Sequence, residues 1–329
     1  MSRLAFLGTP IEAAVCLRAL VEEGHEIVMV VTRPDGREGR GHRVKRSPVR
    51  EVADDLGLRV SERTADAATA GAELGVVVAY GRMIPASVLH QLPFVNVHFS
   101  LLPRWRGAAP VEWAILTGDS RTGVSLMALD EGLDTGDVYA TRAVEISEDD
   151  TAATLRSRLT TVGKEMLLEA LAGGAGSLGT PRLQEGDSTY APKITQEMLR
   201  LEWSRSAEGL RRVVRVGGAW TVFRGRRLKV HDARVFPLPL GSKGPEGPGR
   251  LALVKTPEWL GAAGGEFSSG AATATQGGSP SNNPPAHVVA GCGAGLLELV
   301  TIQVEGRKPM SGTQWWSGAR PAVSDVLGS

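Results

Sequence analysis

Four short apolar runs, rich in Val, Ile and Leu, alternate with helical patterns in the first hundred residues. Each run ends at a loop or turn, and helical patterns such as Pro10 to Glu23 and Ser47 to Leu56 lie between them. Alternating strands and helices indicate a parallel sheet that helices cover on both faces. The sequence therefore predicts an α/β fold with a doubly wound, Rossmann-like parallel sheet. The four runs read RLAFLG, HEIVMVVT, LGVVVAYG and FVNVHF.

A second, smaller domain is expected after this sheet. Further strands at 123–128 and 136–144 and a helix at about 151–172 complete the first domain. Short strand-like runs without regular intervening helices follow, which is typical of a small β-barrel or sandwich. A stretch dominated by Gly, Pro, Ser, Ala and Thr is expected to be a flexible insertion between its strands. The expected ranges are 1–185 for the first domain, 186–205 for a linker, 206–329 for the second domain and 237–286 for the insertion.

Composition and charge exclude few functions on their own. The formal net charge is +1, so nothing global indicates a polyanionic partner. The two cysteines, Cys16 and Cys292, are far apart and have no metal-ligand spacing, which favours a reducing compartment and no metal site. The N-terminus runs directly into a strand-like segment, and no apolar run reaches about 18 residues. We therefore expect a cytoplasmic protein without a membrane span.

The run FVNVHF carries two polar side chains at its end. In the segment FVNVHFSLLPRWRGAAP, residues 94–110, Asn96 and His98 are two positions apart, so both point to one face of a strand. Ligands of open α/β sheets bind at the carboxyl ends of the strands. A ligand site is one interpretation of this pair, and a buried polar pair satisfied by loop backbone is the other.

An acidic turn with two glycines, LDEGLDTGD, follows at residues 129–137. Such a turn is usually only a solvated loop, but this one separates two expected strands of the same sheet. It can bring the carboxylate of Asp134 to Asn96 and His98. An amide, an imidazole and a carboxylate that meet at a sheet edge can form an acid/base site with an oxyanion donor.

These three residues suit direct transfer of an acyl group to an amine. The sequence has no nucleophile elbow, and its six histidines show no metal spacing. Asn96 and an N–H of His98 can stabilise a tetrahedral oxyanion, and losing one such donor costs about 2.7–4 kcal/mol of barrier. Asp134 can orient His98 or relay the proton that leaves the amine, worth roughly a hundredfold. No G-x-G-x-x-G follows the first strand, so hydride transfer is a weak alternative.

The order of these segments resembles that in the methionyl-tRNA formyltransferases, which belong to the enzymes that use 10-formyltetrahydrofolate. The resemblance covers about residues 3–235 and resumes at GLLELVTIQVEGRKPM. The block NVH…SLLP…RG.AP marks the wider class, and GLDTGD together with a basic insertion marks the tRNA-directed members. The segments are FLGTP, VTRPDG…GRG…SPV, VVVAYG, NVHFSLLPRWRGAAPVEWAILTGD, TGVSLMALDEGLDTGD and TYAPKI.

The resemblance implies transfer of the formyl group of 10-formyltetrahydrofolate to the α-amino group of methionine on initiator tRNA. It also implies a formyltransferase fold with an OB-like C-terminal β-barrel that binds tRNA, no metal, and a monomer. The catalytic residues of the family fall on Asn96, His98 and Asp134, in agreement with the residue-based placement. The folate-contacting turn falls on Ser100, Leu101, Leu102 and Pro103. The tRNA-binding residues fall on Arg40, Arg43, Lys45 and Arg46.

Two basic regions fit an RNA partner. Residues 33–50 carry seven Arg or Lys against two acids, a local net charge of +5, and residues 200–234 carry ten against three, a local net of +7. Basic glycine-containing loops commonly become ordered on phosphate, although an idle solvated loop has the same composition. The second region can form an electrostatic track for the tRNA backbone on the small barrel.

The chain also departs from the family pattern. Glu12 stands where relatives usually carry an aromatic residue, the segment at 216–220 is shorter than expected, and the 237–286 insertion is unusual. Two other functions stay open at this point. The first is formyl transfer from the same folate to a sugar-nucleotide amine or a small amine, and a screen of acceptors distinguishes it from transfer to methionyl-tRNA. The other is a non-enzymatic RNA-binding protein with a degenerate catalytic fold, for which His98→Ala has no activity to remove.

Overall fold

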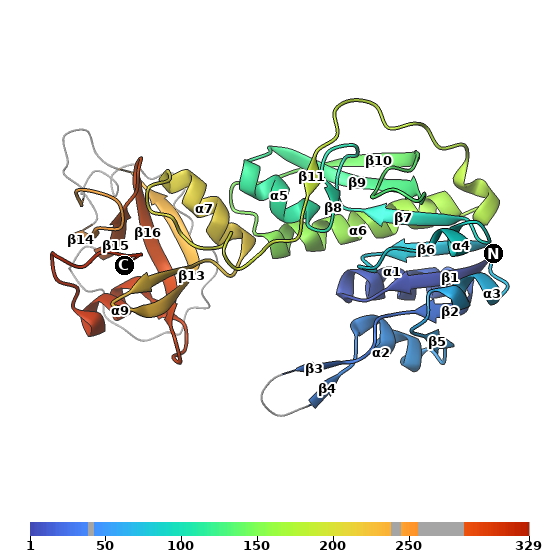
Figure 1. Cartoon of the computed structure of the whole chain (residues 1–329), viewed down its shortest axis with the longest axis horizontal. Helices are drawn as coiled ribbons and strands as arrows, with labels where there is room; N and C mark the ends of the chain where they lie inside the picture. The colour runs from blue at the N-terminus through green and yellow to red at the C-terminus, as the bar shows by residue number, and fades with distance from the viewer. Residues whose placement is uncertain (39–42, 238–244, 256–285, 329) are drawn as a thin grey trace, which may run out of the picture. The chain divides into compact units, whose positions relative to one another are not determined.

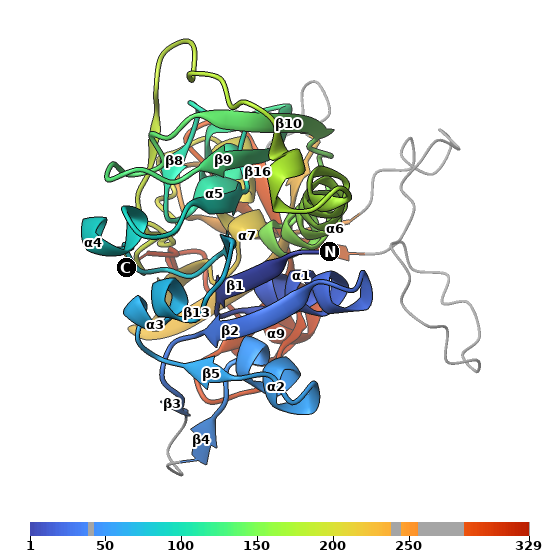
Figure 2. The same ribbon diagram turned by 90° about the vertical axis from the view of Figure 1, so that its right-hand side faces the viewer.

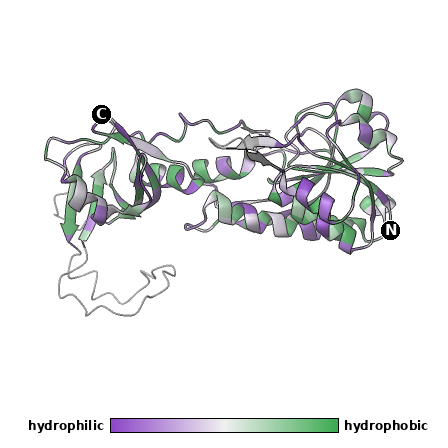
Figure 3. Ribbon diagram, turned by 90° about the horizontal axis from the view of Figure 1, so that it is seen from below, coloured by the Kyte–Doolittle hydropathy of each residue, from purple (hydrophilic) through white to green (hydrophobic). Residues whose placement is uncertain are grey.

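The computed structural model describes residues 1–38, 43–237, 245–255 and 286–328 (Figure 1). The chain divides into two compact units, Met1–Ile194 and Thr195–Ser329. In the parts of the chain that the structure describes, no helix is long and apolar enough to cross a membrane. The central strands of the first unit are largely hydrophobic, whereas the helices beside them carry both hydrophobic and hydrophilic residues (Figure 3).

The first unit is built on a seven-stranded sheet in the order β10-β9-β7-β6-β1-β2-β5. All four apolar runs form strands of this sheet, and the five strands from β5 to β7 are parallel, which confirms the doubly wound arrangement. Strand order reverses between β1 and β6, because the chain first builds outward to β5 and then returns. The parallel strands are β1 (Arg3–Gly8), β2 (Glu26–Val31), β5 (Val60–Ser61), β6 (Leu74–Val78) and β7 (Phe94–His98).

One strand of the sheet, β9, runs against the expectation of a wholly parallel sheet. β9 (Arg121–Ala128) is antiparallel to β7, and β10 (Val138–Glu145) is antiparallel to β9. The reason lies in their connection: β9 and β10 are joined by the loop 129–137, which is too short for a helical crossover between parallel strands. The sheet is therefore mixed: β9 is antiparallel to both of its neighbours, and β10 at the edge runs in the same sense as the five parallel strands.

Helices cover both faces of this sheet (Figure 2). α1 and α6 pack on one face, while α3 and α4 lie on the other with a buried cluster that includes Val77, Tyr80 and Phe94. Gly163 allows α6 to approach β7, because a Cβ there would lie 2.8 Å from Cγ1 of Val97. The helices are α1 (Ile11–Glu22), α2 (Pro48–Asp55), α3 (Ala65–Thr69), α4 (Ala86–Leu89), α5 (Pro110–Thr117), α6 (Ala152–Leu171) and the 3₁₀ helix η1 (Ala175–Leu178).

Two short strand pairs complete the first unit. β3 (Gly36–Glu38) and β4 (Arg43–Lys45) form an antiparallel hairpin that leads into α2 (Figure 1). β8 (Arg106–Gly107) and β11 (Tyr190–Ala191) pair in parallel. Residues 189–191 of the expected linker are therefore attached to the first unit by backbone hydrogen bonds.

The second unit contains an antiparallel sheet in the order β12-β13-β16-β15-β14, with β17 beside β16. The short strands expected after the first domain are present, and β14 is a strand inside the range expected as an insertion. The rest of that insertion lies mainly outside the described residues. Two helices were not expected, although the buried positions Ala207, Leu210, Val213 and Val214 give α7 a clear amphipathic spacing. The elements are α7 (Ala207–Val216), β12 (Trp220–Phe223), β13 (Arg226–Phe236), β14 (Leu251–Lys255), β15 (Ala286–Gly291), β16 (Leu296–Val304), β17 (Met310–Ser311) and α9 (Gly312–Ala319).

Candidate active site

A cavity of about 400 Å³ lies in the first unit over β6 and β7. Its walls come from the segment after β6, the end of β7, the loop between β9 and β10, and the residues that precede and begin α5. Apolar side chains form most of the surface, and a few polar groups converge on it, which is the usual character of a small-molecule site. The polar lining residues are Arg82, Asn96, His98, Asp130, Asp134 and Arg156, and the large apolar ones are Tyr80, Met83, Ile84, Phe99, Leu129 and Leu133.

The strand alternation brings Asn96 and His98 to this cavity as expected. Both are buried, with 9% and 6% of their surface exposed. Within the described ranges, nothing hydrogen-bonds to the Asn96 amide, even though the side chain is nine-tenths buried. Its amide atoms are not among the enclosed unpartnered atoms of the described residues, so they are open to the cavity, where a ligand or water can satisfy them. This feature favours the ligand-site interpretation of the pair.

The protonation of His98 is set by a backbone carbonyl. Its Nε2 lies 3.0 Å from the carbonyl oxygen of Trp105. A carbonyl oxygen can only accept, so Nε2 carries the proton and donates it. In the neutral ring the lone pair is then on Nδ1, which lies 3.6 Å from Oδ2 of Asp134. His98 can accept a proton at Nδ1 and direct the resulting N–H toward a carboxylate.

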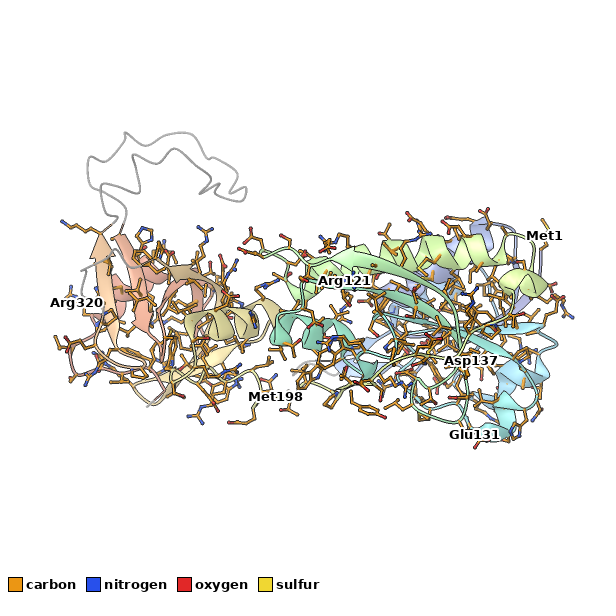
Figure 4. The ribbon with its side chains drawn as sticks, turned by 90° about the horizontal axis from the view of Figure 1, so that it is seen from above. Met1, Arg121, Glu131, Asp137, Met198 and Arg320 are labelled. Atoms are coloured by element: carbon orange, nitrogen blue, oxygen red, sulfur yellow. The ribbon has the colours of Figure 1, made fainter. Side chains whose placement is uncertain are left out.

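Asp134 reaches His98 because its loop folds back along β7. The loop begins beside the amino end of that strand, where the Leu129 N–H donates to the Phe94 carbonyl. Glu131, in this loop, lies at the outer edge of the unit, whereas Asp137, at the end of the loop, lies beside the strands of the sheet (Figure 4). Asp134 itself has a left-handed backbone, with φ 52°, and its Oδ2 accepts the Gly107 N–H at 2.7 Å. The three expected catalytic residues therefore meet at one cavity.

The expected folate-contacting turn does not line this cavity. Leu101 instead borders a separate hollow of about 380 Å³ with Arg104 and Asp119. Ser125 fixes the turn, because its hydroxyl donates to the Ser100 carbonyl at 2.7 Å and accepts the Leu102 N–H at 3.1 Å. The Leu102–Pro103 peptide bond is cis. Here the turn carries the chain from His98 to Trp105, and contact of Ser100, Leu101, Leu102 and Pro103 with folate stays a prediction.

Three of the four expected tRNA-binding residues, Arg43, Lys45 and Arg46, lie in β4 or directly after it. Arg40 lies outside the described residues, and Arg43 and Lys45 are placed only by the backbone of β4. Arg46 is exposed, and its Nη1 donates to Oδ2 of Asp54 at 3.0 Å. A surface pair of this kind contributes little to stability and leaves the guanidinium accessible to phosphate. Their role in binding RNA stays a prediction.

A buried ionic group next to the cavity accounts for Glu12. Arg156 of α6 lines the cavity and pairs with Glu12 of α1, at 3.5 Å between Nε and Oε1, and with Glu112 of α5. Glu12, expected from the sequence to depart from the family pattern, is 9% exposed and compensated by this arginine. Sequence reasoning did not single out Arg156 or Glu112, because the contact joins three helices that are distant in sequence.

The second unit has a basic hollow of about 430 Å³. Phe223 and Trp315 supply aromatic surface, and four arginines line the hollow. One of these, Arg224, is paired with Asp325 at 2.6 Å. Among the described residues, Nε of Arg227 is buried without a hydrogen-bond partner. The other two arginines are Arg226 and Arg307.

The fold and the cavity define a group-transfer enzyme of the α/β class, and sequence comparison identifies its family. Residues 2–171 match the formyl transferase family and residues 193–320 match its C-terminal domain, so the chain belongs to the formyl transferases. The methionyl-tRNA formyltransferase of Streptomyces coelicolor is 38% identical over 99% of both chains.

Solved structures share the fold at low sequence identity. HypX from Aquifex aeolicus, crystallised with tetrahydrofolic acid, is 19% identical with a TM-score of 0.61, and the match covers 98% of this chain and 48% of HypX. The N-formyltransferase of Helicobacter canadensis, in complex with folinic acid and dTDP-3-aminofucose, is 14% identical with a TM-score of 0.60. That match covers 91% of this chain and 99% of the Helicobacter protein.

Proposed function

We propose that this protein transfers the formyl group of 10-formyltetrahydrofolate to the α-amino group of methionine on initiator tRNA. The observation that carries the proposal is the convergence of Asn96, His98 and Asp134 on one cavity of a formyl transferase. The choice of acceptor is supported by the name of the Streptomyces coelicolor relative, which aligns over nearly the whole chain. Both substrates belong to translation initiation, which fits the expected cytoplasmic location. The chemistry below requires only one copy of the chain.

The cavity fits a reduced folate in size and character. A volume of about 400 Å³ is within the roughly 300–1,000 Å³ of small-molecule sites. Tyr80, Met83 and Ile84 offer apolar surface to a flat ring, and the unpaired amide of Asn96 offers hydrogen-bond donors to a carbonyl oxygen. No metal is needed for the step proposed.

The acceptor amine attacks the formyl carbon, so a new C–N bond forms and the carbonyl oxygen becomes an oxyanion. Asn96 donates an N–H to this oxygen, a contribution of about 2.7–4 kcal/mol. His98 accepts the proton that leaves the amine at Nδ1, and the carboxylate of Asp134, 3.6 Å away, stabilises the imidazolium. The bond to N10 of the folate then breaks, and His98 returns the proton to N10. The products are formyl-methionyl-tRNA and tetrahydrofolate, with atoms and protons balanced.

RNA binding is proposed for both basic regions. In the second unit, Arg226, Arg227 and Arg307 line a hollow in which Asp325 neutralises only Arg224. Such a surface attracts phosphates and makes binding depend on salt. Arg40 and its neighbours in the first unit are proposed to contact the acceptor stem. Removal of Arg40 is expected to reduce the salt slope of tRNA binding, and an unaltered slope would contradict that role.

The test is an acceptor comparison with pure protein and labelled 10-formyltetrahydrofolate. We expect label on methionyl initiator tRNA and at most traces on sugar-nucleotide amines or free methionine. Label on a sugar-nucleotide amine alone would support the alternative acceptor. No label on any acceptor, with substrates that a known formyltransferase converts, would support the non-enzymatic alternative.

A further inference from the structure

Residues 182–191, here called the strap, connect the two loops that form the catalytic part of the cavity. The strap lies between the ranges that the two family models match. Its start is fixed on β10, because the backbone groups of Arg182 and Val138 exchange two hydrogen bonds at 2.8 and 2.9 Å. Its end is fixed on the loop after the Ser100–Pro103 turn, where β11 pairs with β8. A side chain between these two anchored ends links the loop that carries Asp134 to the loop that carries Arg106.

That side chain is Gln184. Its Nε2 donates to the carbonyl oxygens of Asp134, at 2.9 Å, and Gly136, at 2.7 Å. Its Oε1 accepts from Nε and Nη2 of Arg106, at 3.0 and 2.7 Å. The full donor and acceptor capacity of the amide is therefore used. The orientation is unambiguous, because a flipped amide would set its oxygen against two carbonyls and its NH₂ against a guanidinium.

These contacts close a network around the carboxylate of the site. Gln184 links the backbone of Asp134 to the side chain of Arg106. The side chain of Asp134 in turn accepts the N–H of Gly107, the residue that follows Arg106. Asp134 has a left-handed backbone, φ 52°, which a non-glycine residue keeps only where its surroundings enforce it. Gln184 supplies that constraint without lining the cavity.

We propose that Gln184, held by Arg106, is a positioning residue for Asp134 and sets the distance between this carboxylate and the His98 imidazole. The proposal rests on the proposed function and adds a residue of the strap to it. Gln184 acts on catalysis only through Asp134, so its loss is expected to change the rate of the chemical step and leave substrate binding nearly unchanged.

The first test is the Gln184→Met variant, which keeps the length of the side chain and removes all four hydrogen bonds. We expect kcat for formyl transfer to fall between about tenfold and a hundredfold, because small displacements of catalytic groups have effects of this size. KM for both substrates is expected to stay within about twofold. The matched control is Glu185→Gln, at an exposed neighbouring position, with kcat unchanged. An unchanged kcat in Gln184→Met would overturn the proposal.

The second test needs no substrate. Amide hydrogen exchange is compared at Gly107, whose N–H donates to Asp134, and at Ala109, whose N–H donates to the Ala191 carbonyl at 3.1 Å. Gln184→Met is expected to accelerate exchange at Gly107 by about tenfold or more and to leave Ala109 protected. If Gln184 only stabilised the fold, its loss would accelerate exchange at both Gly107 and Ala109, and that result would contradict the proposal.

The two tests separate the positioning role from the proposed function. If the wild-type protein transfers no formyl group, the proposed function fails, and the exchange comparison still decides whether Gln184 positions Asp134. If Gln184→Met does not fold, Gln184→Glu replaces it, because the carboxylate keeps the bonds from Arg106 and loses only the two donations. The same loss of kcat and the same selective exchange are expected, and wild-type behaviour would refute the role.

Discussion

Replacing Asp134 by Asn removes the negative charge that faces His98 and keeps the size of the side chain. Oδ2 of Asp134 lies 3.6 Å from Nδ1, and the two side chains are 13% and 6% exposed. At an effective dielectric constant of about 20, a unit charge pair at this distance interacts by roughly 4–5 kcal/mol. The imidazolium is only partly formed in the transition state and some screening remains, so we expect about half of this, roughly 2–3 kcal/mol. That corresponds to a fall in kcat of about 30- to 160-fold.

The assay is single-turnover transfer of labelled formyl to methionyl-tRNA at saturating substrates, with KM values measured separately. The fold is expected to persist, because the Asn oxygen can still accept the Gly107 N–H. The matched control is Glu131→Gln in the same loop, which removes one negative charge from an exposed pair with His90. A wild-type kcat in Asp134→Asn, or a change in KM alone, would show that the Asp134 charge does not stabilise the His98 imidazolium. The same would follow if Glu131→Gln lowered kcat equally.

Three further variants test other parts of the structure. Asn96→Ala is expected to lower kcat by about 10²–10³ in the same assay, because the oxyanion loses a donor, and a loss below about threefold would contradict that role. Gly107→Ala is expected to lower the free energy of unfolding in urea by about 1–3 kcal/mol or more, since φ is +120° and the new Cβ would lie 2.9 Å from the Ala191 carbonyl oxygen; wild-type stability would contradict this. Burial alone would raise the pKa of Asp119, but hydrogen bonds from Arg104 and Trp105 outweigh it and lower that pKa. The stability that Asp119 contributes is therefore fully present above about pH 4 and is lost as the pH falls through its folded pKa. Asp119→Asn should then reduce the free energy of unfolding by about 1 kcal/mol at pH 7 and by less at a pH below the folded pKa. An equal difference at both pH values would contradict this sign.

The sequence predicts the strands well because their alternation is a local property. Two-residue spacing in β7 is enough to place Asn96 and His98 on one face, and the apolar runs are enough to define the parallel strands. The antiparallel direction of β9 was not predicted, although the short loop that joins it to β10 makes these two strands antiparallel. The helix α7 was not predicted, because its helical spacing of apolar residues lies among runs that read as strands.

Loop paths could not be predicted, because distant residues fix them. Nothing in LDEGLDTGD shows that Asp134 returns along β7, since the contacts that hold it come from Gly107 and Gln184. The position of the Ser100–Pro103 turn outside the cavity likewise depends on Ser125, on a neighbouring strand. Arg156 reaches the cavity from a helix that begins well after the expected site residues.

The central claim is that His98 takes the proton of an attacking amine while the formyl carbon is in the cavity. The most direct measurement is single-turnover transfer of labelled formyl from 10-formyltetrahydrofolate to methionyl initiator tRNA by the wild-type protein and by His98→Ala. We expect rapid transfer by the wild type and at least a hundredfold slower transfer, on the order of a lost general base, by His98→Ala, which should still bind tRNA. Equal rates for the two proteins would contradict it.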